Sequence, residues 1–434
     1  MKKAPSPIVS LIPIIVLVLL LFATIRTFGS DALSGGSQVS LLTTTAICIL
    51  IGMVFYKIPW KDYELAITNN IAGVATAIII LLIIGALSGI WMISGVVPTL
   101  IYYGMQIIHP SFFLASTCII CALISVMTGS SWTTIATIGI ALMGIGKAQG
   151  FEDGWIAGAI ISGAYFGDKI SPLSETTILA SSITDTPLFR HIRYMMITTV
   201  PSLVITLIIF TVAGFSHDAN NTQHIAEVAT ALNEKFHITP WLLIVPVATG
   251  ILIAKKVPSI VTLFLSTLLA AVFALIFQPD LLEEISGIAA SGFDSLFKGL
   301  MMTIYGETNL HTDNAVLTDL IATRGMSGMM NTIWLILCAM CFGGAMTASG
   351  MVGSITSIFV RFMKKTVSVV SATVCSGLFL NLTTADQYIS IILTGNMFRD
   401  IYAKKGYESC LLSRTTEDAV TVTSALIPWN SCGL

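Results

Sequence analysis

Charged residues are scarce in this sequence. Asp, Glu, Lys and Arg make up 10% of its 434 residues, whereas they supply roughly 25% of an ordinary soluble domain. Hydrophobic residues make up 55%, and the mean hydropathy is +0.89. This balance excludes a water-soluble globular fold and predicts an all-α polytopic membrane protein that lies in the lipid bilayer. The net charge of −2 identifies no further partner, and we expect no nucleic acid.

The patterns that mark enzymes are missing too. The sequence contains no nucleophile paired with a base, no phosphate-binding loop and no His-rich metal spacing. We therefore expect a protein that is not an enzyme and that has no cofactor. Two CxxC pairs, Cys118 with Cys121 and Cys338 with Cys341, lie in apolar runs, where we interpret the thiols as small packing groups.

Long apolar runs are what the sequence has in quantity. Helices need about 20 apolar residues to cross a bilayer. The first run follows Lys2 and Lys3, and we interpret it as the first transmembrane helix because it is longer than the core of a signal peptide. A multi-pass protein of the cell (cytoplasmic) membrane is predicted. The main runs are residues 8–25, 38–56, 74–93, 195–215, 239–254, 257–277 and 332–348.

Basic residues predict the orientation of the chain. With these crossings and a cytoplasmic N-terminus, fourteen of the 21 Lys and Arg residues fall on the cytoplasmic side. Only Lys147, Lys235, Lys298 and Arg324 fall clearly outside. Cytoplasmic loops are rich in Lys and Arg, so the N-terminus is predicted to lie in the cytoplasm.

The two halves of the chain share a pattern. Residues 73–95 match residues 328–350 at an offset of 255, including the Ser-Gly pair that ends each segment. At the same offset, the polar stretch MTGSSWTT (127–134) lies opposite NLTTADQY (381–388). Each stretch interrupts an apolar segment, which predicts a re-entrant hairpin in each half.

A second polar interruption follows each hairpin. After a loop deletion of five residues, an offset of 250 pairs Asp168 with Asp418 and Ser174 with Ser424. The charge bias makes the two halves run in opposite directions. We therefore predict two inverted structural repeats, each with a re-entrant hairpin and a broken transmembrane helix, as in many secondary transporters.

These elements divide the chain into four predicted parts. Residues 1–57 are predicted to form N-terminal transmembrane helices, and residues 216–325 a connecting region with two transmembrane helices (239–277) and an external loop. Repeat 1 is predicted at 58–215, with its hairpin at 111–146 and its broken helix at 154–184. Repeat 2 is predicted at 326–434, with its hairpin at 366–398 and its broken helix at 407–431. A helix equivalent to 191–215 is expected after this second broken helix, so repeat 2 is expected to be C-terminally incomplete.

The stretch GDKISPLSETT (167–177) carries the strongest chemical signal. Pro172 removes a backbone donor, so the helix is predicted to stop near Asp168 and to restart near Ser174. Free carbonyls and carboxylates at membrane depth are suited to a small hard cation. Burial favours protonation of a carboxylate and a bound cation opposes it, so proton and cation compete. We predict a Na+ site at Asp168 and Glu175, with ion- or proton-binding roles for Asp168, Glu175, Ser171, Ser174, Thr176, Thr177 and Asp418.

Other polar residues extend the candidate site, and each has a structural alternative. Asp168 is also placed to pair with Lys169, and Asp418 with Arg414 at i−4. Ser and Thr in membrane helices often only bond to preceding carbonyls. The hairpin-tip candidates are Ser130, Ser131, Thr133, Thr134, Thr383, Thr384 and Asp386. The candidates on the second broken helix are Thr421, Ser424 and Asn430.

GDKISPLSETT, together with TGSSWTT, TEDAV and PWN, resembles the NhaC-type Na+/H+ antiporter family over most of the chain. The resemblance implies membership of the wider ion-transporter superfamily, with two inverted repeats and commonly a homodimer. It carries family function onto the residues that match its central motif: Gly167, Asp168, Lys169, Ser171, Pro172, Ser174, Glu175, Thr176 and Thr177.

A secondary active transporter that exchanges Na+ for H+ is therefore the expected function. The alternative is a Na+- or H+-coupled transporter of an organic anion or amino acid, such as a malate/lactate exchanger. Hairpin hydroxyls serve either function, because they can bind a metal ion or a substrate carboxylate.

Overall fold

The computed structural model describes residues 5–216, 222–255, 257–288, 292–308, 310, 318, 321–355 and 366–433. Residues 309, 311–317, 319 and 320 of the predicted external region lie outside these ranges. Six basic residues of the predicted cytoplasmic set lie outside them as well, namely Lys2, Lys3, Lys256, Arg361, Lys364 and Lys365. Every element in the described part of the chain is a helix. The all-α prediction is therefore confirmed for these residues.

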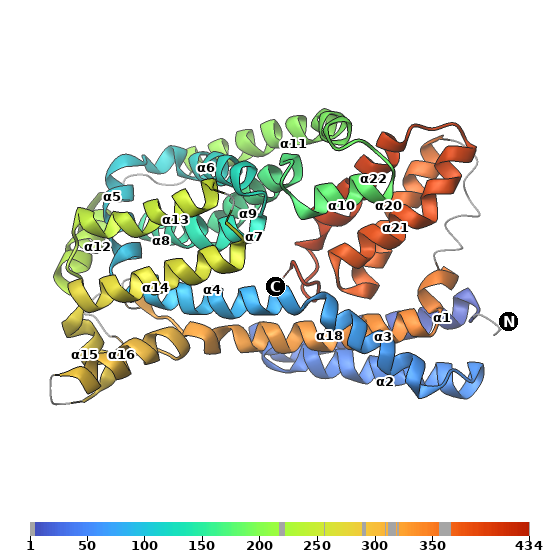
Figure 1. Cartoon of the computed structure of the whole chain (residues 1–434), viewed down its shortest axis with the longest axis horizontal. Helices are drawn as coiled ribbons and strands as arrows, with labels where there is room; N and C mark the ends of the chain where they lie inside the picture. Colours follow the sequence, from blue (N-terminus) through green and yellow to red (C-terminus); the bar gives the residue numbers. More distant parts are fainter. Residues whose placement is uncertain are drawn as a thin grey trace. The chain divides into compact units, whose positions relative to one another are not determined.

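The chain forms two compact units, and the first comprises residues 1–78, 176–194 and 330–434. In this unit α18 packs against α2 and α3, and α20, α21 and α22 pack against one another, as Figure 1 shows. Ser6 caps the first helix, because its hydroxyl accepts a hydrogen bond from the Val9 amide and Pro7 follows at the first helical position. The helices are α1 (Pro7–Phe28), η1 (Gly29–Ser34), α2 (Gly36–Tyr56), α3 (Trp60–Gly73), α18 (Met330–Ala348), α20 (Thr366–Thr384), α21 (Gln387–Lys404) and α22 (Ser409–Ser424).

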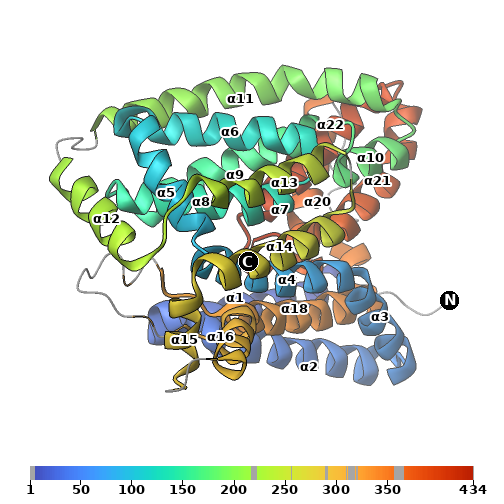
Figure 2. The same cartoon turned by 60° about the vertical axis from the view of Figure 1, so that its left-hand side comes forward.

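The second unit comprises residues 79–175 and 195–329. Its most extensive helix pair is α6 with α9, which lie side by side in Figure 2. A large apolar core that includes Trp91, Phe113 and Leu263 holds this unit together. The helices are α5 (Val96–Ile107), η2 (Pro110–Phe112), α6 (Phe113–Thr128), α7 (Ser131–Thr134), the π-helix η3 (Ile135–Gly139), α8 (Ile140–Ala148), α9 (Asp153–Ile170), α12 (Thr222–Lys235), η4 (Pro240–Leu243), α13 (Ile244–Ala254), α14 (Ser259–Phe277), α15 (Pro279–Ser286), α16 (Phe293–Tyr305) and η5 (Gly325–Met329).

Three helices include residues of both ranges: α4 (Ala75–Ile93), α10 (Glu175–Ile183) and α11 (Leu188–Ser216). Eight helices in the described part of the chain are long and apolar enough to cross a membrane. They are α1, α2, α4, α6 with η2, α11, α14, α18 with η5, and α20. A polytopic membrane protein is the fold class that this count supports.

One predicted crossing, 239–254, differs from the structure. The α-helix there covers only Ile244–Ala254, and a bend of 94° separates Ala229–Lys235 from Pro240–Ala254. The bend falls where the residues before Pro240 leave the helical conformation, as a residue that precedes proline usually does.

The predicted helix breaks are present. Helix α9 ends at Ile170, the residues around Pro172 are not helical, and α10 begins at Glu175. In the second half, α22 ends at Ser424, and the chain around Pro428 is again not helical. The predicted hairpin segments correspond to α6 with α7–α8 and to α20 with α21, each pair joined by two residues.

Candidate ion-binding site

Two glycines bring α9 against α6. A Cβ atom at Gly163 would collide with the carbonyl oxygen of Cys118, and one at Gly167 would collide with that of Ala122. Glycines four residues apart allow two membrane helices to approach backbone to backbone. The hydroxyl of Ser125 adds a hydrogen bond of 2.6 Å to the carbonyl of Ala164. This packing fixes the last turn of α9, which carries Asp168.

The break after α9 is tied to the end of α6. The Ser171 hydroxyl donates to the Val126 carbonyl at 2.8 Å and accepts from the Leu173 amide at 3.2 Å. Gly129, which follows α6, has φ +66°, and a Cβ there would lie 2.6 Å from the Cβ of Leu173. Glycine is required at this point because the backbone is left-handed and the broken segment lies directly against it.

Asp168 and Ser131 form the centre of this arrangement. The Ser131 hydroxyl donates to Oδ2 of Asp168 at 2.9 Å, and both side chains are buried. Oδ1 of Asp168 is buried and accepts no well-formed hydrogen bond from the described residues, although the Ser174 hydroxyl lies near the same carboxyl group. A buried charged oxygen without a donor is costly. A proton or a cation at Oδ1 would remove this cost.

The other hydroxyls of the first hairpin tip are mostly engaged locally. Ser130 caps α7 by accepting from the Thr133 amide at 3.2 Å, and the Thr134 hydroxyl donates to the Ser130 carbonyl at 3.0 Å. Thr133 contacts another helix, because its hydroxyl donates to the hydroxyl of Ser259, the first residue of α14, at 3.0 Å. Of the four predicted tip residues in this half, the described contacts bring only Ser131 to the carboxylate.

The remaining residues of the central motif differ in burial. Ser174, Thr176 and Thr177 are buried, and Lys169 is buried as well. Glu175 is exposed in the first turn of α10, close enough to Asp168 for the two carboxylates to repel each other. A cation between these two carboxylates would relieve the repulsion.

A second polar cluster lies within the first unit, at the start of α21. Asp386 is 3% exposed and caps this helix, with Oδ1 accepting from the Ile389 amide at 2.9 Å. Its Oδ2 accepts from the Ser431 hydroxyl at 3.0 Å. The preceding residue, Ala385, has φ +58° and accepts a hydrogen bond from the Ser431 amide at 2.8 Å.

Amide side chains hold the second hairpin to α22. The Asn381 side chain donates to the Val420 carbonyl at 2.6 Å, and Asn430 donates to the Asn381 carbonyl at 3.2 Å. The Ser424 hydroxyl lies 3.3 Å from the side-chain amide oxygen Oε1 of Gln387 and donates to the Thr421 carbonyl at 2.6 Å. These contacts place the predicted residues Asp386, Ser424 and Asn430 in one buried network.

The predicted tip residues Thr383 and Thr384 and the predicted helix residue Thr421 lie beside this network. Thr383 and Thr384 donate back to Phe379 and Leu380, both at 2.9 Å. Thr421 is buried, and its hydroxyl makes no hydrogen bond within the described part of the chain.

The contacts of the two clusters correspond at an offset of 256. The bond from Ser125 to Ala164 matches that from Asn381 to Val420. The bond from Ser131 to Asp168 matches the pair Ser424 and Gln387. Left-handed Gly129 likewise matches left-handed Ala385, and the cap Ser130 matches the cap Asp386.

This register corrects the predicted pairing of Asp168 with Asp418. Asp168 corresponds to Ser424, and Pro172 corresponds to Pro428. The Asp418 side chain is 29% exposed and lies 3.9 Å from Arg414, the i−4 ion pair that was the structural alternative. Arg414 also stacks on Tyr194, with its Cζ atom 5.0 Å from the ring centre.

Three buried polar residues were not among the predicted site residues: Gln387 and Asn381 of the second cluster, and Glu417 on α22. Glu417 is completely buried on α22, although its neighbour Asp418 was selected. A signal for Glu417 was present, since it shares a helix face with Val420 and Ser424 at i+3 and i+7. Gln387 and Asn381 lie inside the stretch NLTTADQY that predicted the hairpin.

Comparison with known proteins identifies the family of this chain. Residues 163–434, which include the C-terminal end of α9 and all of α22, match the Na+/H+ antiporter family. The chain is a membrane protein of the antiporter class. It belongs to the Na+/H+ antiporter family.

Several curated relatives cover most of the chain. The Na+/H+ antiporter NhaC of Bacillus subtilis is 35% identical over 394 residues, which are 90% of this chain and 84% of the relative. The NhaC protein of Alkalihalophilus pseudofirmus is 37% identical over 390 residues, 89% of this chain and 81% of the relative. The malate-2H+/Na+-lactate antiporter of Bacillus subtilis is 36% identical over 399 residues, 92% of this chain and 82% of the relative.

Proposed function

We propose that this protein is a secondary active transporter that exchanges Na+ for H+ across the cell membrane. The buried Asp168 carboxylate is the observation that carries the proposal. Its Oδ2 accepts a hydrogen bond from the Ser131 hydroxyl, whereas its Oδ1 accepts no well-formed hydrogen bond among the described residues. One ligand at a time neutralises such a group. Competition between a proton and Na+ for Asp168 is the basis of the exchange.

The surroundings of the Asp168 carboxylate support binding of a cation. Asp168 lies in the last turn of α9, whose C-terminal dipole end favours a cation. Glu175 contributes a second negative charge nearby. Na+ prefers oxygen ligands, and the proposed Na+ site consists of Asp168 and Glu175 with oxygens of Ser171, Ser174, Thr176 and Thr177. In this proposal Na+ and H+ are the transported ions, and no cofactor is expected.

We further propose that the two corresponding clusters belong to two inverted repeats, each with a re-entrant hairpin and a broken helix. The matching contacts at an offset of 256 support a common origin of the two local structures. The bias of Lys and Arg supports opposite orientations and a cytoplasmic N-terminus. A homodimer is proposed on the family resemblance alone.

Transport in proteoliposomes tests the role of Asp168. Asp168→Asn keeps the shape of the side chain but removes its charge, so Na+-driven proton movement should be lost. Asp153→Asn is the matched control, because Asp153 begins the same helix and its side chain is 67% exposed. If Asp168→Asn transports as fast as the unmodified protein, the assignment is wrong.

The second candidate function is Na+- or H+-coupled transport of an organic anion. The similarity to the malate-2H+/Na+-lactate antiporter, 36% identical, favours it. In this case the hydroxyl and amide groups of the hairpin tips would bind a substrate carboxylate. Uptake of radiolabelled malate or lactate, compared with Na+-dependent proton movement reported by an internal pH dye, separates the two functions.

A further inference from the structure

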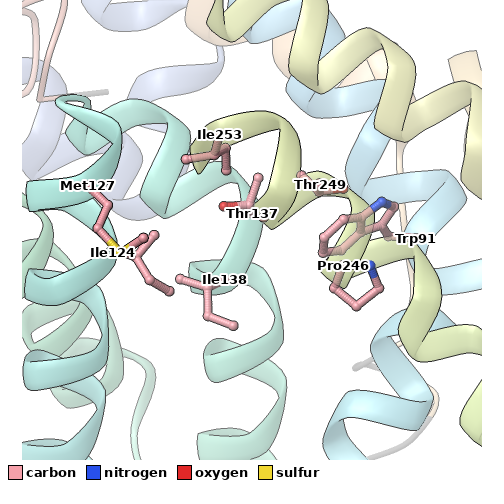
Figure 3. A pocket seen from close by; sticks show the side chains of 9 residues that line it. Trp91, Ile124, Met127, Thr137, Ile138, Pro246, Thr249 and Ile253 are labelled. Atoms are coloured by element: carbon pink, nitrogen blue, oxygen red, sulfur yellow. The ribbon is translucent and has the colours of Figure 1, made fainter. Parts of the chain in front are cut away.

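An apolar cavity of about 130 Å³ lies within the second unit, between the first hairpin and residues of α4 and α13 (Figure 3). Residues of four elements line it, namely α4, α6, the π-helix η3 and α13. Figure 3 shows Ile124 and Met127 facing Trp91 and Pro246 across the space. The lining residues are Trp91, Ile124, Met127, Thr137, Ile138, Pro246, Thr249, Gly250 and Ile253.

The few polar atoms in the wall are already hydrogen-bonded inside the protein. The Thr137 hydroxyl donates to the Thr133 carbonyl at 2.7 Å. The Trp91 indole donates to Ser266 at 3.1 Å, and Thr249 bonds to the same hydroxyl at 2.7 Å. An apolar cavity of about 150 Å³ stays dry and binds small apolar molecules. This cavity therefore suits an apolar occupant that needs no hydrogen bond.

The outer surface indicates where the occupant comes from. Ile119, Leu123 and Met127 lie four residues apart along α6, and their side chains are 44%, 62% and 57% exposed. They form an apolar stripe on a helix that is long enough to cross the membrane. Since Met127 belongs both to this stripe and to the cavity wall, the cavity continues the surface that lipid tails contact.

Helix α13 contributes a glycine to the cavity wall. Pro246, Thr249, Gly250 and Ile253 form one face of this helix, and no atom lies within 4 Å of a Cβ built at Gly250. Gly250 is exposed and belongs to the cavity wall, so a side chain at this position has open space beside the cavity. The absence of one keeps room for a ligand.

We propose that this cavity binds the end of a lipid acyl chain. The bound chain contacts Thr137 and Ile138, which belong to the π-helix that follows the Ser131 turn. π-helical segments are rare and are frequent at functional sites. The lipid tail thus supports the helix segment that presents Ser131 to Asp168.

Photocrosslinking tests the proposal on the full chain in lipid nanodiscs. The probe is a phosphatidylcholine with a diazirine near the end of one acyl chain, and labelled peptides are identified by mass spectrometry. We expect labelling of the peptides that contain residues 124–138 and 246–253. Gly250→Leu should abolish the labelling at 124–138, because the new side chain occupies the cavity.

Val247→Leu is the matched control, since Val247 is 60% exposed on the other face of α13 and its substitution should leave the labelling intact. Gly250→Ala provides a milder change that should reduce the labelling without a collision. The proposal is overturned if Gly250→Leu, folded as judged by size-exclusion chromatography, is labelled at 124–138 as strongly as Val247→Leu. Labelling confined to the exposed faces of α6 and α13 in the unmodified protein would overturn it as well.

Discussion

Ser131 and Asp168 are joined by a buried hydrogen bond of 2.9 Å between the hairpin tip and the end of α9. At the two positions that lie 256 residues further on, Ser424 and Gln387 form a neutral pair at 3.3 Å. The two clusters thus share a contact at corresponding positions, but only the contact in the first cluster includes a carboxylate. In the second cluster the carboxylate belongs to the hairpin tip, as Asp386, and a serine occupies the helix position. This asymmetry predicts different roles for the two carboxylates.

Ser131→Ala should shift the pH dependence of exchange to higher pH by about one to two units, because a hydrogen bond to a charged group contributes about 1.5–3 kcal/mol and one pH unit corresponds to about 1.4 kcal/mol. The substitution removes a donor that stabilises the charged form of Asp168. A higher pH is then needed to release the proton. The measurement is Na+-dependent proton movement in proteoliposomes over a series of pH values.

Ser130→Ala is the control for this shift. It removes the cap that accepts from the Thr133 amide but leaves the bond between Ser131 and Asp168. Its pH profile should therefore stay in place, although the loss of a helix cap costs about 0.5–2 kcal/mol of stability. Equal pH profiles for the two variants would contradict the role of Ser131.

Substitution of Gly167 by alanine should destabilise the second unit by several kcal/mol, roughly the upper range of effects for single substitutions in a packed core. Its Cβ would collide with the Ala122 carbonyl, so α9 would move away from α6. Gly158→Ala on the same helix is the control. The nearest atom to its Cβ lies 3.9 Å away, and alanine favours a helix interior by about 1 kcal/mol over glycine. Thermal unfolding in detergent should show opposite shifts for the two variants.

The break in α9 was predictable from the sequence because it has a local cause. Proline cannot donate the backbone hydrogen bond that a helix interior requires, so Pro172 limits α9 to residues before it. The structure ends this helix at Ile170, two residues after the predicted end. The apolar runs were equally predictive, since hydrophobic length is a property of each segment alone.

The register between the halves was not predictable in the same way. Ser94 and Gly95 correspond to Ser349 and Gly350 at an offset of 255, as predicted, and their backbone bonds match. The hairpins correspond at an offset of 256, one residue more than the offset between the Ser-Gly pairs. Only the backbone geometry reveals this difference, because left-handed Gly129 corresponds to left-handed Ala385. A non-glycine residue in this conformation is uncommon, so the sequence carries no signal for it.

Asp386 allows folding and transport to be separated. Asp386→Asn keeps an N-cap that accepts from the Ile389 amide, so the stability should change little. Na+-driven proton movement should fall if this buried carboxylate contributes its charge to the cycle. Asp386→Ala removes the cap as well and should lower the free energy of unfolding by about 0.5–2 kcal/mol more. Full transport by a stably folded Asp386→Asn protein would limit Asp386 to a structural role.

The exposure of the two acidic residues on α22 predicts which of them contributes more to transport or stability. Successive residues on a helix lie about 100° apart, so Glu417 and Asp418 face different surroundings. Glu417 is completely buried, whereas the Asp418 side chain is 29% exposed and forms an ion pair with Arg414. Glu417→Gln, which preserves the size of the side chain, should therefore reduce transport or stability strongly.

Asp418→Asn should have a smaller effect by comparison, because its side chain is partly exposed and its ion pair with Arg414 is long, at 3.9 Å. Transport in proteoliposomes and thermal unfolding in detergent, measured on both variants side by side, distinguish the two positions. A larger loss in Asp418→Asn than in Glu417→Gln would mean that the role first predicted for Asp418 is right and that burial on α22 does not identify the functional carboxylate.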